Sequence, residues 1–378
     1  MAKEFVGEGS AFNLEAILEE EKPRKIFLVV DLDAYGKSGA EALFSSTLKN
    51  FEIVIFSDFQ ENPKIEEIQK GVEAFRFCNP DVVLAVGGGS ALDVAKSVNA
   101  LAVQEGDPLD FVLKKKELKN LGKPLVAVPT TAGTGAEATH FAVVYVNNAK
   151  YSFAHPFVLP TYSIVDPQFT FSLPSRITAA TGMDALAQAI ESYWSNKSTD
   201  ESKGYAREAL LLVIPNLSVA VNNPNPDARS AMSKGAHLAG KAINISQTTA
   251  CHAISYPITS FFGVAHGHAV ALTMGSMLLF NSEVDETTVQ DERGAEYVKK
   301  TMAEIFDVLG VKNGTEAKKM IGDLMVFIHL ETGLHNLGIK TEQDRELIVK
   351  NGFNPERVKN NPRVLTEQNL RAILNEIE

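Results

Sequence analysis

The feature that most constrains the fold of this chain is a regular alternation of short apolar runs with helical stretches over residues 1–170. Strands that alternate with helices are joined by crossover connections, so they pair in parallel and are covered by helices on both faces. The sequence therefore predicts an α/β unit with a parallel sheet. The strand-like runs are residues 25–31, 51–59, 81–86, 124–131 and 162–167, with a further hairpin within 141–155 that turns at Asn147 and Asn148.

The second half of the chain has a different pattern. From residue 177 onward, long helical runs replace the strand-like ones, as in "GMDALAQAIESYWS" and "SKGYAREALLLVIPNLSVAV". A chain of 378 residues is also too long for one simple core. We therefore expect two domains, an α/β domain over residues 1–170 and an all-helical domain over residues 171–378.

The charge of the chain limits its partners and its location. A net charge of −11 argues against a nucleic-acid backbone as the main partner. The 41 residues from Ala242 to Ser282 contain no Asp, Glu, Lys or Arg, but Pro, Gly and His interrupt them, so we expect a buried segment and no membrane span. The first residues lack the apolar stretch of an export signal, and Cys78 and Cys251 lie far apart. These features indicate a cytoplasmic protein with free thiols.

Three successive glycines, Gly87, Gly88 and Gly89, lie between a predicted strand and a predicted helix. Glycine lets backbone N–H groups approach a phosphate, and a helix N-terminus favours negative charge, so this loop is a candidate site for a nucleotide pyrophosphate. A tight turn that needs glycine is the alternative. Ser90 is predicted to cap the helix, with Asp93 completing a capping box. The loop matches neither the G-x-G-x-x-G fingerprint nor a Walker loop.

Two further groups of polar residues follow predicted strands. Thr130, Thr131 and Thr134 come at the end of the fourth strand-like run. Because ligands of open α/β sheets bind at the carboxyl ends of the strands, these threonines are candidate cofactor contacts. Asp31 ends the first run, where a carboxylate can bind the ribose hydroxyls of NAD and would repel the 2′-phosphate of NADP. Capping of the next turn is the alternative role for Asp31.

The helical half carries polar side chains in apolar surroundings. Asp184 and Gln188 are four residues apart, so on a helix they share one face at a separation of about 6 Å. His252, His266 and His268 lie in the segment without charges. One such histidine is usually a core residue, but three imidazoles with a carboxylate and an amide form a ligand set for Zn²⁺ or Fe²⁺. A bound cation would also offset the cost of burying these groups.

The segments "GGGSALDVAKS", "PTTAGTGAEAT", "TGMDALAQAIESY" and "HAISYPITSFFGVAHGHAVAL" resemble, in order and spacing, the iron-containing (group III) alcohol dehydrogenases. The resemblance covers nearly the whole chain. It implies a Rossmann-like dinucleotide-binding domain followed by an all-helical domain, an arrangement of the dehydroquinate synthase-like kind. It also implies hydride exchange between NAD and a small primary alcohol or aldehyde, a divalent metal (Zn²⁺ or Fe²⁺), and a homodimer.

The resemblance also assigns roles to individual residues. The family's metal ligands fall on Asp184, Gln188, His252 and His266. The cofactor contacts would be Asp31, Gly87, Gly88, Gly89, Ser90, Asp93, Thr130, Thr131, Thr134 and Lys150.

Two positions depart from the family pattern. The family usually has histidine where this chain has Gln188, whose amide oxygen is a weaker donor to Zn²⁺ or Fe²⁺. Many relatives have another histidine where this chain has Tyr256, so the proton would pass to Tyr256, to His268, or through the cofactor ribose to water. A lyase that uses NAD transiently, as in dehydroquinate synthase, and a non-catalytic binding protein are the alternatives to a dehydrogenase.

The segments "ALAQAIESYW", "HAISYP" and "HGHAVALT" look most like one branch of the family, which acts on small anionic molecules. That branch includes reductases of phosphonoacetaldehyde and the enzyme that oxidises C8 of 3-deoxy-manno-octulosonate. We therefore expect a small, anionic substrate.

Overall fold

The computed structural model describes residues 2–147, 149–353 and 358–378. The chain forms two compact units, Met1–Leu173 and Pro174–Glu378, which are described separately. The helices and strands of the first unit are β1 (Lys3–Val6), α1 (Asn13–Glu21), β2 (Lys25–Val30), α2 (Leu32–Lys37), α3 (Ala40–Leu48), β3 (Glu52–Phe56), α4 (Ile65–Cys78), β4 (Val82–Gly87), α5 (Gly89–Ala102), α6 (Pro108–Val112), β5 (Leu125–Pro129), β6 (Phe141–Val146), β7 (Ala149–Ala154) and β8 (Tyr162–Val165).

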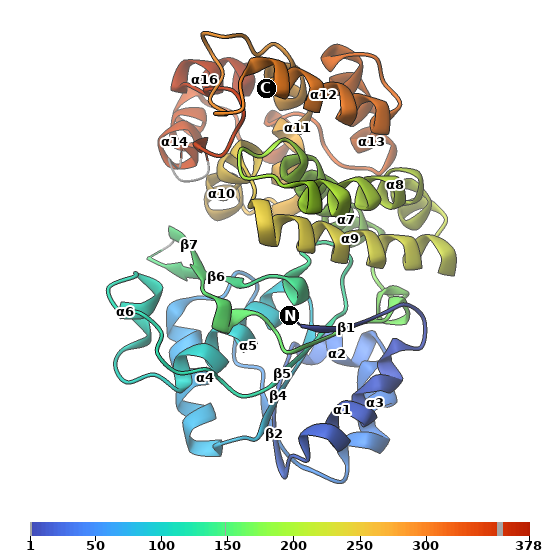
Figure 1. Cartoon of the computed structure of the whole chain (residues 1–378), viewed down its shortest axis with the longest axis vertical. Helices are drawn as coiled ribbons and strands as arrows, with labels where there is room; N and C mark the ends of the chain where they lie inside the picture. Colours follow the sequence, from blue (N-terminus) through green and yellow to red (C-terminus); the bar gives the residue numbers. More distant parts are fainter. Residues whose placement is uncertain (1, 148, 354–357) are drawn as a thin grey trace. The chain divides into compact units, whose positions relative to one another are not determined.

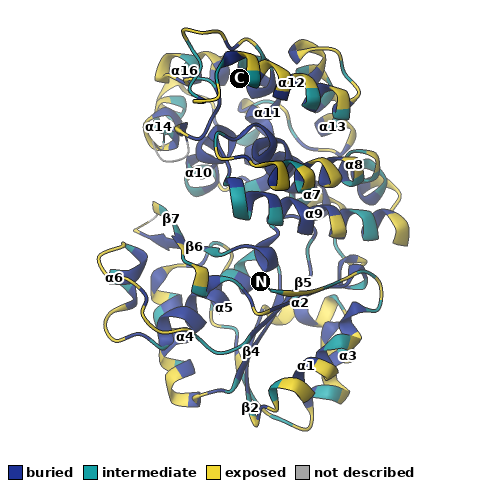
Figure 2. Cartoon of the chain, in the orientation of Figure 1, coloured by how far each residue is buried: buried dark blue, intermediate teal, exposed yellow. Residues whose placement is uncertain are grey.

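The first unit is built on a six-stranded parallel sheet in the order β1-β8-β5-β4-β2-β3 (Figure 1). Alternate residues of the central strands enter two separate apolar cores. In β4, Val83 and Ala85 pack on the side of α4 and α5, whereas Leu84 and Val86 pack on the side of α1 and α3. Figure 2 shows these strands buried and the outer faces of the helices exposed. Burial on both faces explains why the strands appear in the sequence as continuous apolar runs.

The predicted α/β class and the five strand-like runs are confirmed, and the chain has additional elements that were not predicted. The edge strand β1 is largely exposed and has no continuous apolar run, which is why its sequence carries no strand signal. The hairpin is confirmed as the antiparallel pair β6 and β7. Of its predicted turn, Asn147 has a positive φ of 49°, and Asn148 lies outside the described residues.

The order of the strands creates a switch point between β2 and β4. The chain runs from β2 outward to β3, then returns to the other side of β2 as β4 and continues to β5. The connections on the two sides of this point leave in opposite directions, so the carboxyl ends of β2 and β4 border the place where open α/β sheets bind ligands. Asp31 follows β2, and Gly87 ends β4. These predicted cofactor residues therefore border the switch point.

The regular elements of the second unit are helices, as predicted, and its described residues add one isolated β-bridge between Val289 and Arg363. Its helices are α7 (Ser175–Trp194), α8 (Asp200–Asn222), α9 (Pro226–Ser246), α10 (Ala250–Phe262), α11 (His266–Ser282), α12 (Ala295–Leu309), α13 (Gly314–Phe327), α14 (Glu342–Gly352) and α16 (Glu367–Glu376). The segment without charges forms the end of α9 and all of α10 and α11, and most of its residues are buried. Within the part of the chain that the structure describes, α8 alone is long and apolar enough to cross a membrane, a test that core helices also pass.

Helices α7 and α11 approach each other closely where α11 begins. A Cβ atom added to Gly267 would overlap the carbonyl oxygen of Ala180 and lie 2.8 Å from Cβ of Asp184. Only glycine permits this approach, which sets the start of α11 against Asp184 on α7.

Gly267→Ala is expected to destabilise the protein by about 1–3 kcal/mol, because a methyl group cannot be added to this contact without moving a helix. The midpoint of thermal unfolding measures the loss. The control is Gly204→Ala on α8, where an added Cβ meets nothing within 4 Å and the helix should be slightly more stable. Equal midpoints for the two variants would mean that the α7–α11 approach is not tight.

Candidate active site

The glycine loop joins β4 to α5 and is shaped by its neighbours. A Cβ atom added to Gly87 would lie 2.7 Å from Ala91, and one added to Gly89 would lie 2.8 Å from Thr134. A Cβ atom on Gly88 would meet Thr131 at 3.4 Å, an ordinary contact. Packing within the protein therefore explains the outer glycines but not Gly88, which precedes the first helical residue and carries no side-chain cap. The N–H groups of this first turn remain suitable for an anion.

The predicted capping box of α5 is wrong. The N-cap is Gly88, and Ser90 lies inside the helix, where its hydroxyl accepts a hydrogen bond from the Asn62 N–H at 3.3 Å. Asp93 accepts instead from the Val143 N–H on β6 at 3.0 Å. Burial raises the pKa of Asp93, and nearby Lys96 opposes that shift. The helix begins two residues earlier than predicted because the extended backbone of Gly88 leads directly into it.

A buried lysine is bonded to the loop of residues 130–139, which contains Thr130, Thr131 and Thr134 and is called here the threonine loop. Lys96 on α5 is fully buried, and its ammonium donates hydrogen bonds to the carbonyl oxygens of Ala136 and Phe141 and to the hydroxyl of Thr139. Burial lowers the pKa of Lys96 to about 8, although Asp93 and Glu137 oppose that shift. The glycine loop and the threonine loop are thus fastened to the same helix.

The other predicted cofactor residues lie around these loops. Thr130 follows β5, and its N–H donates to the carbonyl oxygen of Gly87 at 2.9 Å. Asp31 caps α2 by accepting from the Ala34 N–H at 2.9 Å, which was its alternative role. Lys150 lies on β7, where it is opposite Tyr145 across the hairpin. Its positive charge acts to lower the pKa of Asp93, against the effect of burial.

Three predicted metal ligands come together in the helical unit. Asp184 on α7, His252 on α10 and His266 at the start of α11 each offer one ligand atom, and these atoms all lie within 4.8 Å of one another. The His252 Nε2 atom lies 3.3 Å from Asp184 Oδ1, and the His266 Nε2 atom lies 4.0 Å from the same oxygen. Asp184 and His252 are buried, whereas His266 is partly exposed. We call these three residues the ligand cluster.

Gln188 lies beside the ligand cluster, one turn along α7 from Asp184. Its amide nitrogen donates to Asp184 Oδ2 at 3.2 Å, and its side chain is buried. The predicted shared face of Asp184 and Gln188 is therefore present.

The structure adds Glu191, which our reading of the sequence missed. Its carboxylate is fully buried and contacts the His252 ring at Nδ1, on the opposite side of the ring from Asp184. Burial alone lowers the pKa of His252, but Glu191 and Asp184 reverse the shift and raise that pKa to about 10. The sequence signal for Glu191 is its position: residues 184, 188 and 191 are spaced so that all three lie on one face of a helix.

The two candidates for proton transfer have different surroundings. The Tyr256 ring stacks on the His266 ring with a centroid separation of 6.1 Å. His268 is buried on α11, and its Nε2 donates to the carbonyl oxygen of Glu331 at 2.7 Å. Burial lowers the pKa of His268. Tyr256 is therefore next to the ligand cluster, whereas the ring of His268 is held by Glu331.

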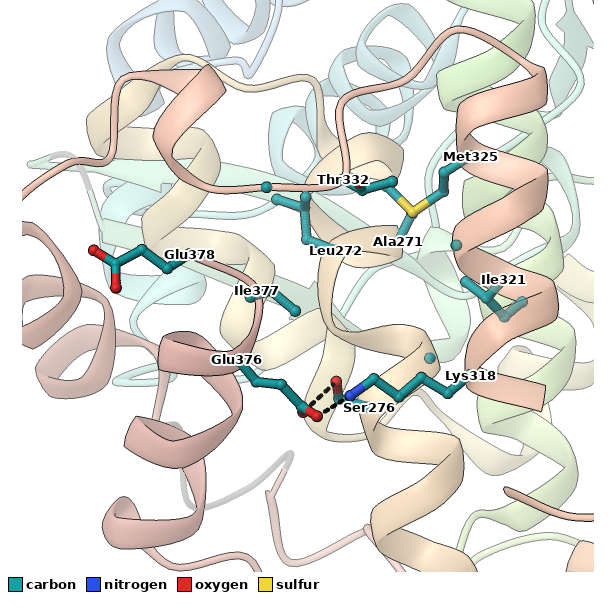
Figure 3. Close-up of a pocket in the computed structure, with 13 residues that line it drawn as sticks. Ala271, Leu272, Ser276, Lys318, Ile321, Met325, Thr332, Glu376, Ile377 and Glu378 are labelled. Atoms are coloured by element: carbon teal, nitrogen blue, oxygen red, sulfur yellow. Dashed lines mark hydrogen bonds and ion pairs between the residues drawn. The ribbon is translucent and has the colours of Figure 1, made fainter. Parts of the chain in front are cut away.

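A separate pocket of about 300 Å³ lies among α11, α13 and the end of the chain (Figure 3). None of the ligand-cluster residues lines it. Three of its polar groups bond to one another: Lys318 forms an ion pair with Glu376, which also accepts a hydrogen bond from the Ser276 hydroxyl. The ligand cluster and this pocket are therefore separate features of the helical unit.

Models of known protein families match the two units of the chain in turn. The model of the iron-containing alcohol dehydrogenases matches residues 2–167, and the model of the C-terminal part of the same family matches residues 178–377. The chain belongs to the iron-containing alcohol dehydrogenase family. It is accordingly an NAD-dependent oxidoreductase of that family, whose cofactors are NAD and a divalent metal.

Individual relatives of this dehydrogenase act on different substrates. It is 32% identical over 337 residues to long-chain-alcohol dehydrogenase 1 of Geobacillus thermodenitrificans, covering 86% of this chain and 82% of that one. It is 34% identical over 317 residues to phosphonoacetaldehyde reductase of Streptomyces viridochromogenes, covering 80% and 77%. Sulfoacetaldehyde reductase of Bifidobacterium kashiwanohense, solved with NAD⁺, superposes with a TM-score of 0.88 at 30% identity, covering 100% and 96%.

Gly88→Ala tests whether the glycine loop binds the cofactor. The added methyl group makes only an ordinary contact within the protein but would occupy space in front of the first-turn N–H groups of α5. We expect NADH binding, measured by fluorescence titration, to weaken at least about tenfold with little change in the unfolding midpoint. Gly89→Ala is the matched comparison, since its methyl group would clash with Thr134 and should lower the midpoint. Unchanged NADH affinity in Gly88→Ala would place the pyrophosphate elsewhere.

Proposed function

We propose that this enzyme interconverts a small anionic primary alcohol and its aldehyde by using NAD and a divalent metal bound at the ligand cluster. The observation that carries the proposal is the convergence of ligand atoms from Asp184, His252 and His266 within 4.8 Å of one another. These residues come from three helices, so the convergence is a property of the fold and not of one local motif.

The donor set fits a divalent transition metal. One carboxylate and two imidazoles are borderline-soft ligands suited to Zn²⁺ or Fe²⁺, and the adjacent Gln188 can add an amide oxygen. His252 presents Nε2 to Asp184 while Glu191 contacts Nδ1, an arrangement common for metal-binding histidines. The Ser255 hydroxyl lies 3.3 Å from His266 Nδ1, which helps to fix that ring as well.

We assign cofactor binding to the carboxyl edge of the parallel sheet. The first-turn N–H groups of α5, after Gly87 and Gly88, would bind the pyrophosphate, and Asp31 would bind the adenosine ribose. The remaining predicted contacts are Gly89, Ser90, Asp93, Thr130, Thr131, Thr134 and Lys150. The support is that Asp31 and the glycine loop border the switch point and that the threonine loop follows the next strand.

The proposed chemistry divides between the cofactors and the side chains of the chain. When bound, a divalent cation supplies Lewis-acid catalysis, which lowers the pKa of a hydroxyl group and polarises a carbonyl group. Asp184, His252 and His266 would hold it, and Gln188 would complete the ligand set. Tyr256 would move the proton, because its ring stacks on His266 and a phenol hydroxyl can donate a proton. His268 is the weaker candidate, since its Nε2–H already donates a hydrogen bond to the backbone carbonyl oxygen of Glu331.

The proposal of an anionic substrate rests on the branch-like sequence segments and on two relatives. Phosphonoacetaldehyde reductase and sulfoacetaldehyde reductase are both named for short aldehydes that carry an anionic group. These relatives favour a short anionic aldehyde over a sugar acid such as 3-deoxy-manno-octulosonate. The homodimer and the cytoplasmic location stay predictions of the sequence, which sedimentation and cell fractionation can check.

If the substrate is anionic, the enzyme should reduce anionic aldehydes faster than neutral ones. With NADH as donor, phosphonoacetaldehyde and sulfoacetaldehyde should be reduced with a kcat/KM at least about tenfold higher than propanal, since an anion-binding contact is worth roughly 1.4 kcal/mol or more. The loss of NADH absorbance measures all three rates. Equal values for charged and neutral aldehydes would contradict the anionic substrate but not the dehydrogenase.

The metal part predicts separate effects on the metal and on NADH. Asp184→Asn or His266→Ala should reduce bound metal and lower turnover by at least about a thousandfold, because one ligand is lost, while NADH binding survives. Metal analysis, turnover and NADH titration measure these effects. Gln188→His should keep or strengthen metal binding, because imidazole is the better donor. The control is Asp323→Asn, an exposed carboxylate paired with Lys319 on α13.

Two results would contradict this assignment. Full metal content in Asp184→Asn would mean that the ion binds elsewhere. Complete metal loss in Gln188→His would mean that position 188 does not face the ion.

A further inference from the structure

Glu191 is a carboxylate buried in the interior of the helical unit. It lies on α7, seven residues after Asp184, and none of its surface is exposed. Burial of an ionised carboxylate is unfavourable by several kcal/mol unless it is paired or hydrogen-bonded. The positions of its neighbours therefore show what this side chain is bound to.

The two carboxylate oxygens of Glu191 have different partners. Oε1 accepts from the N–H groups of Thr249 at 3.2 Å and Cys251 at 2.9 Å, and from the Thr249 hydroxyl at 2.7 Å. The His252 N–H lies at 3.4 Å from the same oxygen. These groups form the N-terminal end of α10, where helix N–H groups have no partner within the helix. Oε2 contacts Nδ1 of the His252 ring.

This division fixes the position of His252 and keeps hydrogen on its Nδ1 atom, which leaves Nε2 as the nitrogen that can exchange hydrogen for a metal. Oε1 holds the backbone at the start of α10, and Oε2 holds the ring that projects from it. A carboxylate accepts hydrogen bonds but cannot donate them, so the ring nitrogen that faces Glu191 must carry hydrogen. The other nitrogen, Nε2, then faces Asp184 at 3.3 Å.

We propose that Glu191 is a positioning residue that holds His252 with Nδ1–H toward α7, so that Nε2 is presented to a metal at the ligand cluster. The inference rests on the metal site of the proposed function. Glu191 does not contact the substrate or the metal in this assignment, and it acts through His252 alone.

Glu191→Gln removes this arrangement with almost no change in volume. An amide has one acceptor oxygen where the carboxylate has two, so its NH₂ group must face either the N–H groups of α10 or the His252 ring. In the first case the start of α10 loses its acceptor, and in the second the ring is driven toward the tautomer with hydrogen on Nε2. Both outcomes weaken metal binding.

The control is Ser192→Ala, the neighbouring buried residue on α7. Ser192 lies within hydrogen-bond distance of Ser246, at 2.7 Å, so its removal also costs a buried polar contact on the same helix. The Ser192 hydroxyl bonds to Ser246 and not to the His252 ring, so Ser192→Ala is a test of general destabilisation.

The affinity experiment uses the full chain, stripped of metal with a chelator and titrated with Zn²⁺ against an indicator dye. Glu191→Gln should bind Zn²⁺ about 10–100-fold more weakly than the wild type, the usual effect of losing such a partner, whereas Ser192→Ala should stay within about threefold. Unfolding midpoints of the metal-free proteins show whether each variant is folded. Equal Zn²⁺ affinities for Glu191→Gln and the wild type would overturn the inference, as would an equal loss in Ser192→Ala.

A second measurement needs no variant. In the zinc-loaded wild-type protein labelled with ¹⁵N-histidine, the His252 ring should show hydrogen on Nδ1 and metal on Nε2. The chain has eight histidines, so the His252 signal can be assigned by its loss in His252→Asn. Metal on Nδ1, or hydrogen on Nε2, would overturn the role of Glu191. Failure of the wild type to bind Zn²⁺ or Fe²⁺ at all would instead contradict the proposed function.

Discussion

The arrangement of the helical unit depends on the burial of two carboxylates on one face of α7. Asp184 and Glu191 are both within the interior, where an uncompensated charge is strongly unfavourable. His252 lies between them, with one ring nitrogen toward each carboxylate. The N–H groups at the start of α10 and His266 at the start of α11 supply the remaining compensation. The two carboxylates of α7 therefore bind α10 and α11 to α7. The same arrangement gathers the ligand atoms of Asp184, His252 and His266, where we propose that a divalent metal binds.

The sheet unit contains the other proposed site, at the glycine loop, where an anion would approach the backbone. Glycine is required at positions 87 and 89 by contacts with Ala91 and Thr134, and the loop that contains Thr134 is held by the buried Lys96. These contacts fix the shape of the loop before any ligand arrives. A binding site of this kind loses little conformational entropy when it is filled.

Much of this structure could be predicted from the sequence, and the failures have physical causes. The buried strands were found because burial on both faces produces continuous apolar runs, but the edge strand β1 has mostly exposed residues and produces none. Asp184, His252 and His266 could be proposed as partners because polar groups in apolar surroundings need compensation. The cap at Ser90 was wrong because a local motif cannot show where the backbone enters the helix. The pair Asp184 and Gln188 does not by itself indicate Glu191, which becomes a candidate only when the same face of the helix is followed one further turn to residue 191.

The pairing of β1 has a consequence for how the first unit assembles. Lys3 lies opposite Tyr162, so the strand that begins the chain finds its neighbour only after almost the entire unit has been synthesised. Contacts between such distant residues form slowly, because a long loop must close before they contribute stability. During synthesis, β4 and β5 can pair before β8 has left the ribosome, whereas β1 cannot pair until β8 is available. The edge strand β1 is therefore the first strand of the sheet to be made and among the last to be joined.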